Sequence, residues 1–430
     1  MTPEVKKRIE QIRQGIVPEG YKKGKIGIVP IKWNEVPFST LFTSTSEYTD
    51  DLKQYPLYSL TIEDGITAKT ERYERSHLVK KENSYKVVRP NDYAYNPMNI
   101  RFGAVARHKG DIPVAVSGYY DIFTTVHESD LVFMDSFLTY GPMITYYNKV
   151  STGSLVEKQR VHFSDFLEFS LALPPLEERK KIAEILSTQD KAIELQGRKI
   201  EELKRFKKGC LEKMFPKKGQ KVPEKRFPGF TDDWEQRKVS TIASDTRGGG
   251  TPATSNETYW SGNIPWIQSS DLSEGKLFGV EPRKYISRDG LNNSATQLVP
   301  ENSIAVVTRV GVGKLAFIPF SYTTSQDFLS LCKLQTEPHF TVYALYQMLQ
   351  GELQAVQGTS IKGMTKDDLL SKSIFAPKDE VEQQQLGSYF RNLDTLITLH
   401  QRKLEEMKKQ KKALMQLLLT GIVKTKGEVR

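Results

Sequence analysis

Arg198-Lys199-Ile200-Glu201-Glu202-Leu203-Lys204 is matched 204 positions later by Arg402-Lys403-Leu404-Glu405-Glu406-Met407-Lys408. The likeness extends without a gap over residues 182–214 and 386–418. Read at alternating steps of four and three residues, both stretches place mostly apolar side chains along a narrow heptad seam. A seam of this width suits one partner helix, so we expect two long helices that pair with each other. The seam residues singled out are Leu186, Ile193, Ile200, Leu203, Phe390, Ile397, Leu404 and Met407.

The rest of the chain also divides into two corresponding parts. A chain of 430 residues is too long for one ordinary core, and the charged, breaker-rich stretch 216–223 separates two halves. Trp33 and Trp234 stand at corresponding places, each followed six residues later by Ser-Thr-Leu or Ser-Thr-Ile. Each half is therefore a mixed segment followed by one long helix. The repeat predicts one fold used twice, with loops of different length.

Local patterns within the mixed segments are mostly those of strands. Residues 303–310 and 315–319 are rich in β-branched side chains and bounded by Gly or Pro, and 341–354 is helical with Thr341 as its expected N-cap. The predicted fold class is α+β, with two similar domains, each followed by a long helix. The predicted boundaries are 1–175 for the first domain, 176–215 for the first helix, 216–226 for a linker, 227–378 for the second domain, 379–422 for the second helix and 423–430 for a basic tail.

The net charge of +10 is concentrated in two segments. Residues 203–226 carry +8 and residues 402–430 carry +6, so the remainder of the chain is acidic overall. Cations near helix C-termini and on solvated flanks explain about half of this excess. The rest could face phosphates or an acidic partner.

Several functional classes lack their sequence signals. No run of 18 apolar residues exists, so no membrane span is expected. The N-terminus lacks an apolar signal core, and two isolated cysteines, Cys210 and Cys332, fit a reducing cytoplasm. Residues 309–314 lack the spacing of a phosphate loop, and Asn96-Pro97-Met98-Asn99 lacks the second Pro and the aromatic of the amino-methyltransferase motif. The six histidines show no metal-ligand spacing, so neither an active site nor a bound metal or cofactor is expected.

Recognition chemistry is present instead. Arg, Lys, Gln, Ser and Thr side chains read base edges or grip phosphates, and we interpret the Gly-rich stretch 247–252 as a flexible loop that brings backbone amides close to a partner. In the first half, basic residues alternate with aromatic ones, although aromatics at strand spacing are more often part of a core. The candidate DNA-binding residues are Arg72, Arg75, Lys80, Lys81, Arg101, Arg107, Arg247, Gly249, Thr251, Trp260, Gln268, Ser269, Arg309, Lys314 and Lys362.

In layout and motifs the chain resembles the specificity subunit of type I restriction–modification systems. The resemblance lies in the two helical repeats, the entry Arg226-Phe-Pro-Gly-Phe-Thr-Asp-Asp-Trp234, the series Gly-Gly-Thr-Pro, Tyr-Trp, Ile-Pro-Trp and Ser-Asp-Leu within residues 249–272, and Ile374-Phe-Ala-Pro377 before the second helix. It implies two target-recognition domains that each read one half of a split double-stranded DNA site. It also implies an antiparallel coiled coil that sets the gap between the halves.

The resemblance further implies that this chain is not itself an enzyme. Two copies of a methyltransferase subunit would bind it, with restriction subunits attached through them, and S-adenosylmethionine would be bound by the methyltransferase subunit. The first half departs from the motif series, because Tyr55-Pro56-Leu57-Tyr58 stands where the second half has Ile-Pro-Trp-Ile. We therefore expect two different half-sites and an asymmetric sequence.

Two other functions stay open on the residues alone. A freestanding DNA enzyme would need a catalytic cluster, and methylation or cleavage by the purified chain would reveal one. A purely structural coiled-coil scaffold would leave the two bulky domains unexplained, and sequence-dependent DNA binding would exclude it.

Overall fold

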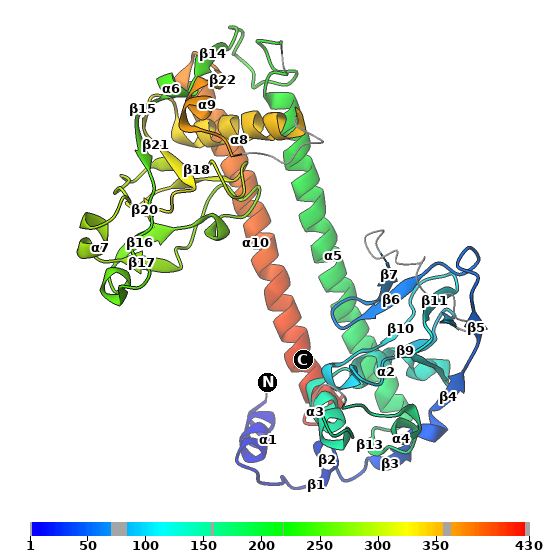
Figure 1. Ribbon diagram of the computed structural model, residues 1–430. Coiled ribbons are helices and arrows are strands. Elements are labelled where there is room, and N and C mark those ends of the chain that lie inside the picture. The colour runs from blue at the N-terminus through cyan, green and yellow to red at the C-terminus, as the bar shows by residue number, and fades with distance from the viewer. Residues whose placement is uncertain (1, 70–83, 156–158, 218, 356–362, 426–430) are drawn as a thin grey trace. The chain divides into compact units, whose positions relative to one another are not determined.

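The computed structural model describes residues 2–69, 84–155, 159–217, 219–355 and 363–425. Helices α5 (Leu176–Met214) and α10 (Glu380–Leu419) begin and end close to the predicted positions (Figure 1). The chain forms two compact units, and their boundaries fall inside these helices rather than at the 216–226 linker. Unit 1 comprises Met1–Gln196 with Lys403–Arg430, and unit 2 comprises Gly197–Arg402. Each unit therefore contains one domain and a part of both helices.

Unit 1 begins with a helix and a hairpin that have no counterpart in the second half. Its strands are β1 (Tyr21–Gly24), β2 (Gly27–Pro30), β3 (Asn34–Pro37), β4 (Phe42–Thr45), β5 (Tyr48–Thr49), β6 (Tyr58–Thr61), β7 (Gly65–Ala68), β8 (Tyr85–Val88), β9 (Tyr93–Tyr95), β10 (Val105–Arg107), β11 (Val114–Ser117), β12 (Asp121–Thr125) and β13 (Ser170–Leu173). Its shorter helices are α1 (Pro3–Arg13), α2 (Leu131–Phe137), α3 (Gly141–Val150) and α4 (Phe163–Leu167). Short 3-10 turns include Ile100–Phe102.

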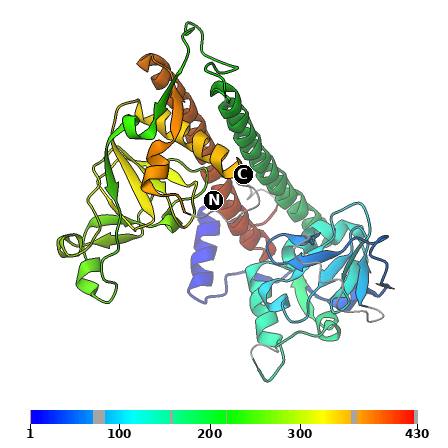
Figure 2. The same ribbon diagram turned by 45° about the horizontal axis from the view of Figure 1, so that its top comes forward.

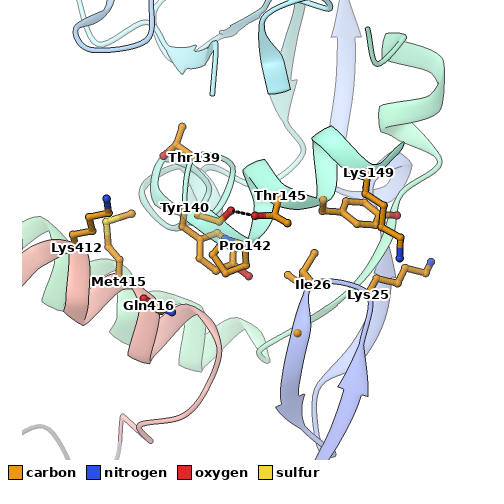
Figure 3. A pocket seen from close by; sticks show the side chains of 13 residues that line it. Lys25, Ile26, Thr139, Tyr140, Pro142, Thr145, Lys149, Lys412, Met415 and Gln416 are labelled. Carbon is orange, nitrogen blue, oxygen red and sulfur yellow. Dashed lines mark hydrogen bonds between the residues drawn. The ribbon is translucent and has the colours of Figure 1, made fainter. Parts of the chain in front are cut away.

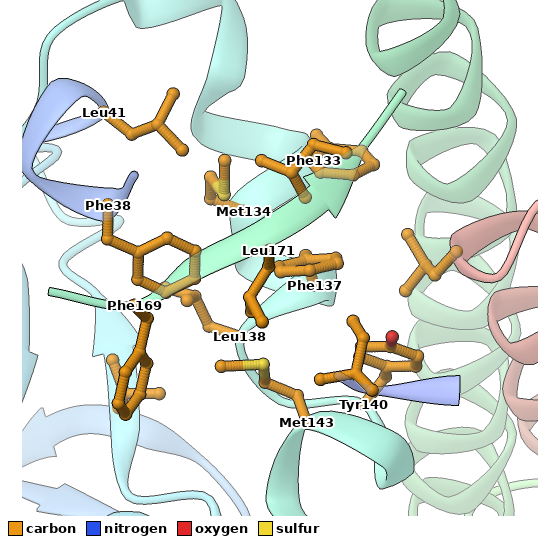
Figure 4. Packing of buried hydrophobic residues seen from close by; sticks show 14 of the residues in the cluster. Phe38, Leu41, Phe133, Met134, Phe137, Leu138, Tyr140, Met143, Phe169 and Leu171 are labelled. Carbon is orange, nitrogen blue, oxygen red and sulfur yellow. The ribbon is translucent and has the colours of Figure 1, made fainter. Parts of the chain in front are cut away.

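Aromatic side chains dominate the core of unit 1. Phe38, Phe42 and Phe166 meet with ring centroids between 5.1 and 5.7 Å apart. Figure 4 shows Phe38 and Phe137 on either side of Leu171, which comes from β13. This core explains why the segment before α5 is strand-like, because β13 supplies buried side chains and pairs with β3 directly before the helix begins.

Unit 2 contains the second domain. Its strands are β14 (Glu235–Lys238), β15 (Ala243–Gly248), β16 (Ile264–Ile267), β17 (Lys284–Ile286), β18 (Ser303–Val307), β19 (Leu315–Ile318), β20 (Thr323–Thr324), β21 (Phe328–Leu334) and β22 (Ser373–Ala376). Its shorter helices are α6 (Val239–Ile242), α7 (Arg288–Asn292), α8 (Pro338–Ala355) and α9 (Lys366–Ser371). Its core joins Trp234 and Phe340 to Phe215 and Phe390 at the ends of the long helices.

The two domains share one sheet topology. Unit 1 has the antiparallel order β10-β9-β12-β4, and unit 2 has β19-β18-β21-β15. In both, the strand that opens the domain pairs with the strand that precedes the long helix, as β3 with β13 and β14 with β22. The second sheets are related as well, since β16 pairs in parallel with β20 and Leu57, directly before β6, forms a parallel bridge with Ala115 of β11. The predicted duplication of the fold is confirmed for the sheets, while the helices and the loops of the two units differ.

The long helices pair antiparallel, as the resemblance implied. In unit 2, Lys207 contacts Asp394 while Cys210, further along α5, contacts the earlier residue Tyr389 of α10. The predicted seam residues are buried or half-buried, and none is exposed. The buried ones are Leu186, Ile200, Phe390 and Ile397, and the half-buried ones are Ile193, Leu203, Leu404 and Met407. Both helices are uninterrupted in both views (Figures 1 and 2).

One local expectation needs correction. Helix α8 begins at Pro338 rather than after Thr341, because the Glu337 carboxylate accepts the backbone amide of Phe340 at 2.5 Å and starts the helix earlier. Thr341 is buried within the first turn, where its hydroxyl donates to the Glu337 carbonyl at 2.6 Å. In addition, the opening segment of unit 1 packs on the end of α10, with the Tyr21 hydroxyl donating to the Gly421 carbonyl at 2.7 Å.

Candidate nucleic-acid interface

In unit 2, most of the predicted DNA-contacting residues lie at one end of the four-stranded sheet. Strands β15 and β18 end there, and the antiparallel strand β21 begins there. We call the segments that meet at this end the unit 2 strand-end loops, defined as residues 249–251, 268–271, 308–314 and 325–327. Hydrogen bonds connect them to one another. These are Thr251 Oγ1 to Gln326 Oε1 at 2.6 Å, Ser325 N to Ile267 O at 2.9 Å, Thr308 N to Asp327 O at 2.7 Å and Lys314 Nζ to Ser269 O at 3.4 Å.

The glycine-rich loop is packed against its own chain rather than free. A Cβ atom added to Gly249 would lie 1.8 Å from the carbonyl oxygen of Ser325. The amide of Gly250 donates to the Thr324 carbonyl at 2.8 Å, and that of Gly248 to the Gln297 side chain at 3.2 Å. The expected flexible loop is thus corrected: glycine is required here because two backbone segments approach too closely for any side chain.

The remaining described candidates of unit 2 differ in whether their polar groups already have partners within the chain. Arg247 pairs with Asp245 at 3.0 Å, and Gln268 caps a short 3-10 turn. The Trp260 indole donates to the Ala253 carbonyl and packs edge-on against Trp266. Lys284, which was not predicted as a site residue, lies over both indole rings, 5.4 and 5.6 Å from their centroids.

Arg309 stands apart from these residues. It is exposed, and the described part of the chain offers it no hydrogen bond or ion pair. It lies in the connection between β18 and β19. Glycines between two β-branched runs predict a hairpin here, which the antiparallel pairing confirms, and Gly311 and Gly313 provide the left-handed backbone at φ 92° and 98°. Among the candidates of unit 2, Arg309 is the cation most available to an external acceptor.

In unit 1, the structure separates two arginines that the sequence grouped together. Arg101 lies in the β9–β10 connection, whereas Arg107 lies at the far end of β10. The Arg107 guanidinium donates to both oxygens of the Asp135 carboxylate, at 2.8–3.2 Å, and to Asn91 at 2.6 Å. Both side chains of the Arg107–Asp135 pair are largely buried. Arg107 is therefore reassigned from DNA contact to an internal ion pair.

The same network explains the titration of Asp135. Burial by itself would raise the pKa of this carboxyl, but hydrogen bonds from Arg107 and Tyr93 and the nearby charge of Lys109 bring the pKa below its ordinary value. Tyr93 and Tyr95, two of the aromatics interleaved with basic residues, are core side chains, and burial raises the pKa of both hydroxyls.

The candidates Arg72, Arg75, Lys80, Lys81 and Lys362 lie outside the described residues.

Each unit also has a groove where a long helix meets a helix of the domain. In unit 1, Lys412, Met415 and Gln416 of α10 face α3 and the β1–β2 hairpin across a cavity of about 770 Å³. Figure 3 shows Tyr140 and Pro142 between Met415 on one side and Ile26 on the other. In unit 2, the residues 204 positions earlier, Lys208, Leu211 and Glu212 of α5, line a cavity of about 900 Å³ beside α8. The repeat therefore produces one groove in each unit.

Charge distinguishes the two grooves. Among the described residues, the groove of unit 1 is lined by Lys25, Lys149 and Lys412 and by no carboxylate, although Glu35 lies 3.8 Å from Lys25. The lining of the unit 2 groove mixes lysines with Glu212, Glu274 and Asp394. An acidic partner surface would be attracted more strongly to unit 1.

Two further searches bear on function. The described residues contain no group of three or more His, Cys, Asp or Glu side chains placed to hold a metal ion. Among the helices that the structure describes, none is both long and apolar enough to cross a membrane.

Comparison with known proteins points to one family. Residues 136–205 and 231–409 match the type I restriction modification DNA specificity domain. The type I restriction enzyme MjaX specificity subunit of Methanocaldococcus jannaschii is 24% identical, with 98% of this chain and 93% of that protein aligned. The EcoR124I/EcoR124II specificity subunit of Escherichia coli is 30% identical over 35% of this chain and 38% of its own length.

Solved structures share the fold. A chain from a study of complex assembly and conformational transition in the type I R-M system aligns with a TM-score of 0.57 and 17% identity, covering 92% of this chain and 99% of that one. The type I restriction-modification S subunit of M. genitalium aligns with a TM-score of 0.53 and 11% identity, covering 93% and 99%.

Proposed function

The chain belongs to the type I restriction modification DNA specificity family, and we propose that it is the specificity subunit of a type I restriction–modification complex. In this role it recognises an asymmetric, bipartite DNA sequence and directs methyltransferase and restriction subunits to it. The observation that carries the proposal is the repeated four-stranded sheet, which bears loops of different sequence and length in each unit. Equivalent scaffolds with unlike loops are suited to reading two unlike half-sites.

We propose that the chemistry lies outside this chain. The strand-end loops of unit 2 offer hydrogen-bond donors, acceptors and the exposed guanidinium of Arg309, which has no partner among the described residues. These groups suit base and phosphate contacts rather than bond cleavage. S-adenosylmethionine would then be bound by the methyltransferase subunit, and this chain would bind no cofactor.

Genome-wide mapping of methylated adenines tests the proposal. The chain is expressed with its cognate methyltransferase subunit, and the control cells express the methyltransferase subunit alone. We expect one bipartite motif with unequal halves, present only when both proteins are made. An undivided motif, an unchanged pattern in the control, or methylation by the purified chain alone would contradict the proposal.

We further propose that two copies of the methyltransferase subunit dock, one at each groove. Identical partners require equivalent surfaces, and Lys412-Met415-Gln416 and Lys208-Leu211-Glu212 are equivalent by the repeat. Because the described lining of the unit 1 groove contains lysines and no carboxylate, this groove should hold an acidic partner surface more tightly than the groove of unit 2.

The exposed lysines Lys412 and Lys208 provide a matched pair of variants. Native mass spectrometry of the complex should show that Lys412→Glu and Lys208→Glu each remove one bound methyltransferase subunit, and that the double variant removes both. Lys412→Glu should have the larger effect on affinity, because no acid lines its groove. Retention of two copies by the double variant would place the partner elsewhere.

A further inference from the structure

The same three-residue pattern occurs in corresponding strand connections of the two units. Arg101-Phe102-Gly103 lies in residues 96–104 between β9 and β10, and Arg309-Val310-Gly311 lies in residues 308–314 between β18 and β19. These strands occupy the same positions in the two sheets. Gly103 and Gly311 both adopt the left-handed region, at φ 98° and 92°, although the strand register equates Gly103 with Gly313, two residues further on. In each unit the chain therefore turns sharply directly after an arginine and a large hydrophobic residue.

Both hydrophobic residues point into solvent. Val310 is 71% exposed, the largest value among the large hydrophobic side chains of the described residues, and Phe102 is 49% exposed. A single exposed apolar side chain is ordinary on a protein surface. Two of them, each beside an arginine in the same connection of a repeated sheet, indicate a shared contact.

Both connections are held in place on a helix of their own domain. In unit 2, the Thr308 carbonyl accepts the Met364 amide at 2.7 Å, and a Cβ on Gly313 would lie 2.4 Å from Leu353 of α8. In unit 1, the Asn148 side chain of α3 donates to the Arg101 carbonyl at 2.7 Å. Because both connections are anchored, the two exposed side chains lose little conformational entropy on binding.

The arginines keep their charge available. Arg309 is exposed and has no hydrogen bond or ion pair within the described chain. Arg101 is half-buried, with its Nε buried and without a partner among the described residues, and its Nη1 donates to the neutral Gln159 side chain at 2.8 Å. The Arg101 guanidinium also lies over the Phe102 ring, 4.6 Å from its centroid. Neither cation is neutralised by a carboxylate that the structure describes, in contrast to Arg107 and Arg247.

We propose that these two triplets are the tips through which the units read base edges, an inference that rests on the proposed function. Each arginine donates to the O6 and N7 acceptors of a guanine, and the adjacent Phe102 or Val310 contacts the methyl group of a neighbouring thymine. A phosphate contact would use the charge alone and would leave the exposed hydrophobic residue facing anionic oxygens. The pairing of a cation with an apolar side chain fits the major-groove edge of base pairs better.

Methylation by the complete complex tests each tip against its own half of the motif. Relative methylation rates are measured on duplexes that carry the wild-type motif and on duplexes with one base pair changed. Arg309→Ala should reduce discrimination at one guanine of one half-site by about 5- to 150-fold, the range for a bidentate arginine contact. Val310→Ser should relax a neighbouring position by less, and Arg101→Ala and Phe102→Ala should act in the same way on the other half-site.

The control is Arg402→Ala, which removes an equal charge from an exposed position on α10. It should leave every position of the motif unchanged. Thermal unfolding of each variant shows whether it remains folded, and Phe102→Ala supplies the reading for unit 1 if Arg101→Ala unfolds. Slower methylation of all duplexes without relaxation at any position would indicate phosphate contact and overturn the inference, as would an unchanged motif in all four tip variants. A wild-type complex without a bipartite motif would overturn the proposed function as well.

Discussion

Two ion pairs that the internal repeat relates to each other lie in different surroundings. Asp190 pairs with Lys411 in unit 1 at 2.5 Å, and Asp394 pairs with Lys207 in unit 2 at 2.6 Å. The Asp190 side chain is 50% exposed, whereas that of Asp394 is 22% exposed and also accepts the Tyr343 hydroxyl at 2.5 Å. The difference arises because α8 covers the helix pair in unit 2. A repeated sequence therefore fixes the partners of a contact, and the neighbouring domain determines what that contact contributes.

Removing the lysine charge of each pair should give the largest difference in unfolding free energy between the two pairs. Lys207→Met leaves the Asp394 carboxylate largely buried without its cation and should lower the free energy of unfolding by about 3 kcal/mol. Lys411→Met, the equivalent change at the exposed pair, should lower it by less than about 1 kcal/mol. Hydrogen exchange in peptides covering residues 386–397 and 182–193 measures both effects. Equal losses of protection in the two variants would show that burial by α8 does not matter.

Unit 1 places its own buried aspartate, cation and tyrosine inside the domain, at Asp135, Arg107 and Tyr93. The pKa of Asp135 is lower in the folded state than its ordinary value, so its ionised form stabilises unit 1. This stabilisation is complete above the pKa of the unfolded chain and is lost as pH falls through the lower pKa of the folded state. Hydrogen bonds to a charged group suggest a contribution of roughly 2 kcal/mol at neutral pH.

Asp135→Asn provides the test, because it removes the titrating group and keeps the side-chain shape. The difference in unfolding free energy between the wild type and this variant should be constant from pH 7 to about pH 5 and should shrink below about pH 4. Amide exchange in β9 reports on unit 1 locally. Asp245→Asn removes a carboxylate on the edge strand β15 of unit 2. It should leave the loss of amide protection in β9 at low pH unchanged. A difference that does not vary with pH would assign the role of Asp135 to shape alone.

Some residues of the candidate site could be predicted from the sequence and others could not, for physical reasons. The hairpin at 309–314 was found because glycines between two β-branched runs are a local signal. Arg107 was misassigned because its neutralising partner, Asp135, lies 28 positions away and nothing in the local pattern connects them. Lys284 was missed because β17 is only three residues long and carries no periodicity. The likeness of Arg101-Phe102-Gly103 to Arg309-Val310-Gly311 could not be predicted from the sequence, because it lies in the strand connection that the triplets share and not in a common register.

The sequence by itself determined the duplication, the two long helices, their seam and the α+β class, since periodicity and repetition are properties of neighbouring residues. Tertiary structure alone decided that each compact unit takes a part of both helices and that the Asp394 pair is more buried than its twin. It also decided which arginines pair with a carboxylate among the described residues. These features depend on contacts between residues as far apart as Lys207 and Asp394, 187 positions along the chain, and on the surface that surrounds them.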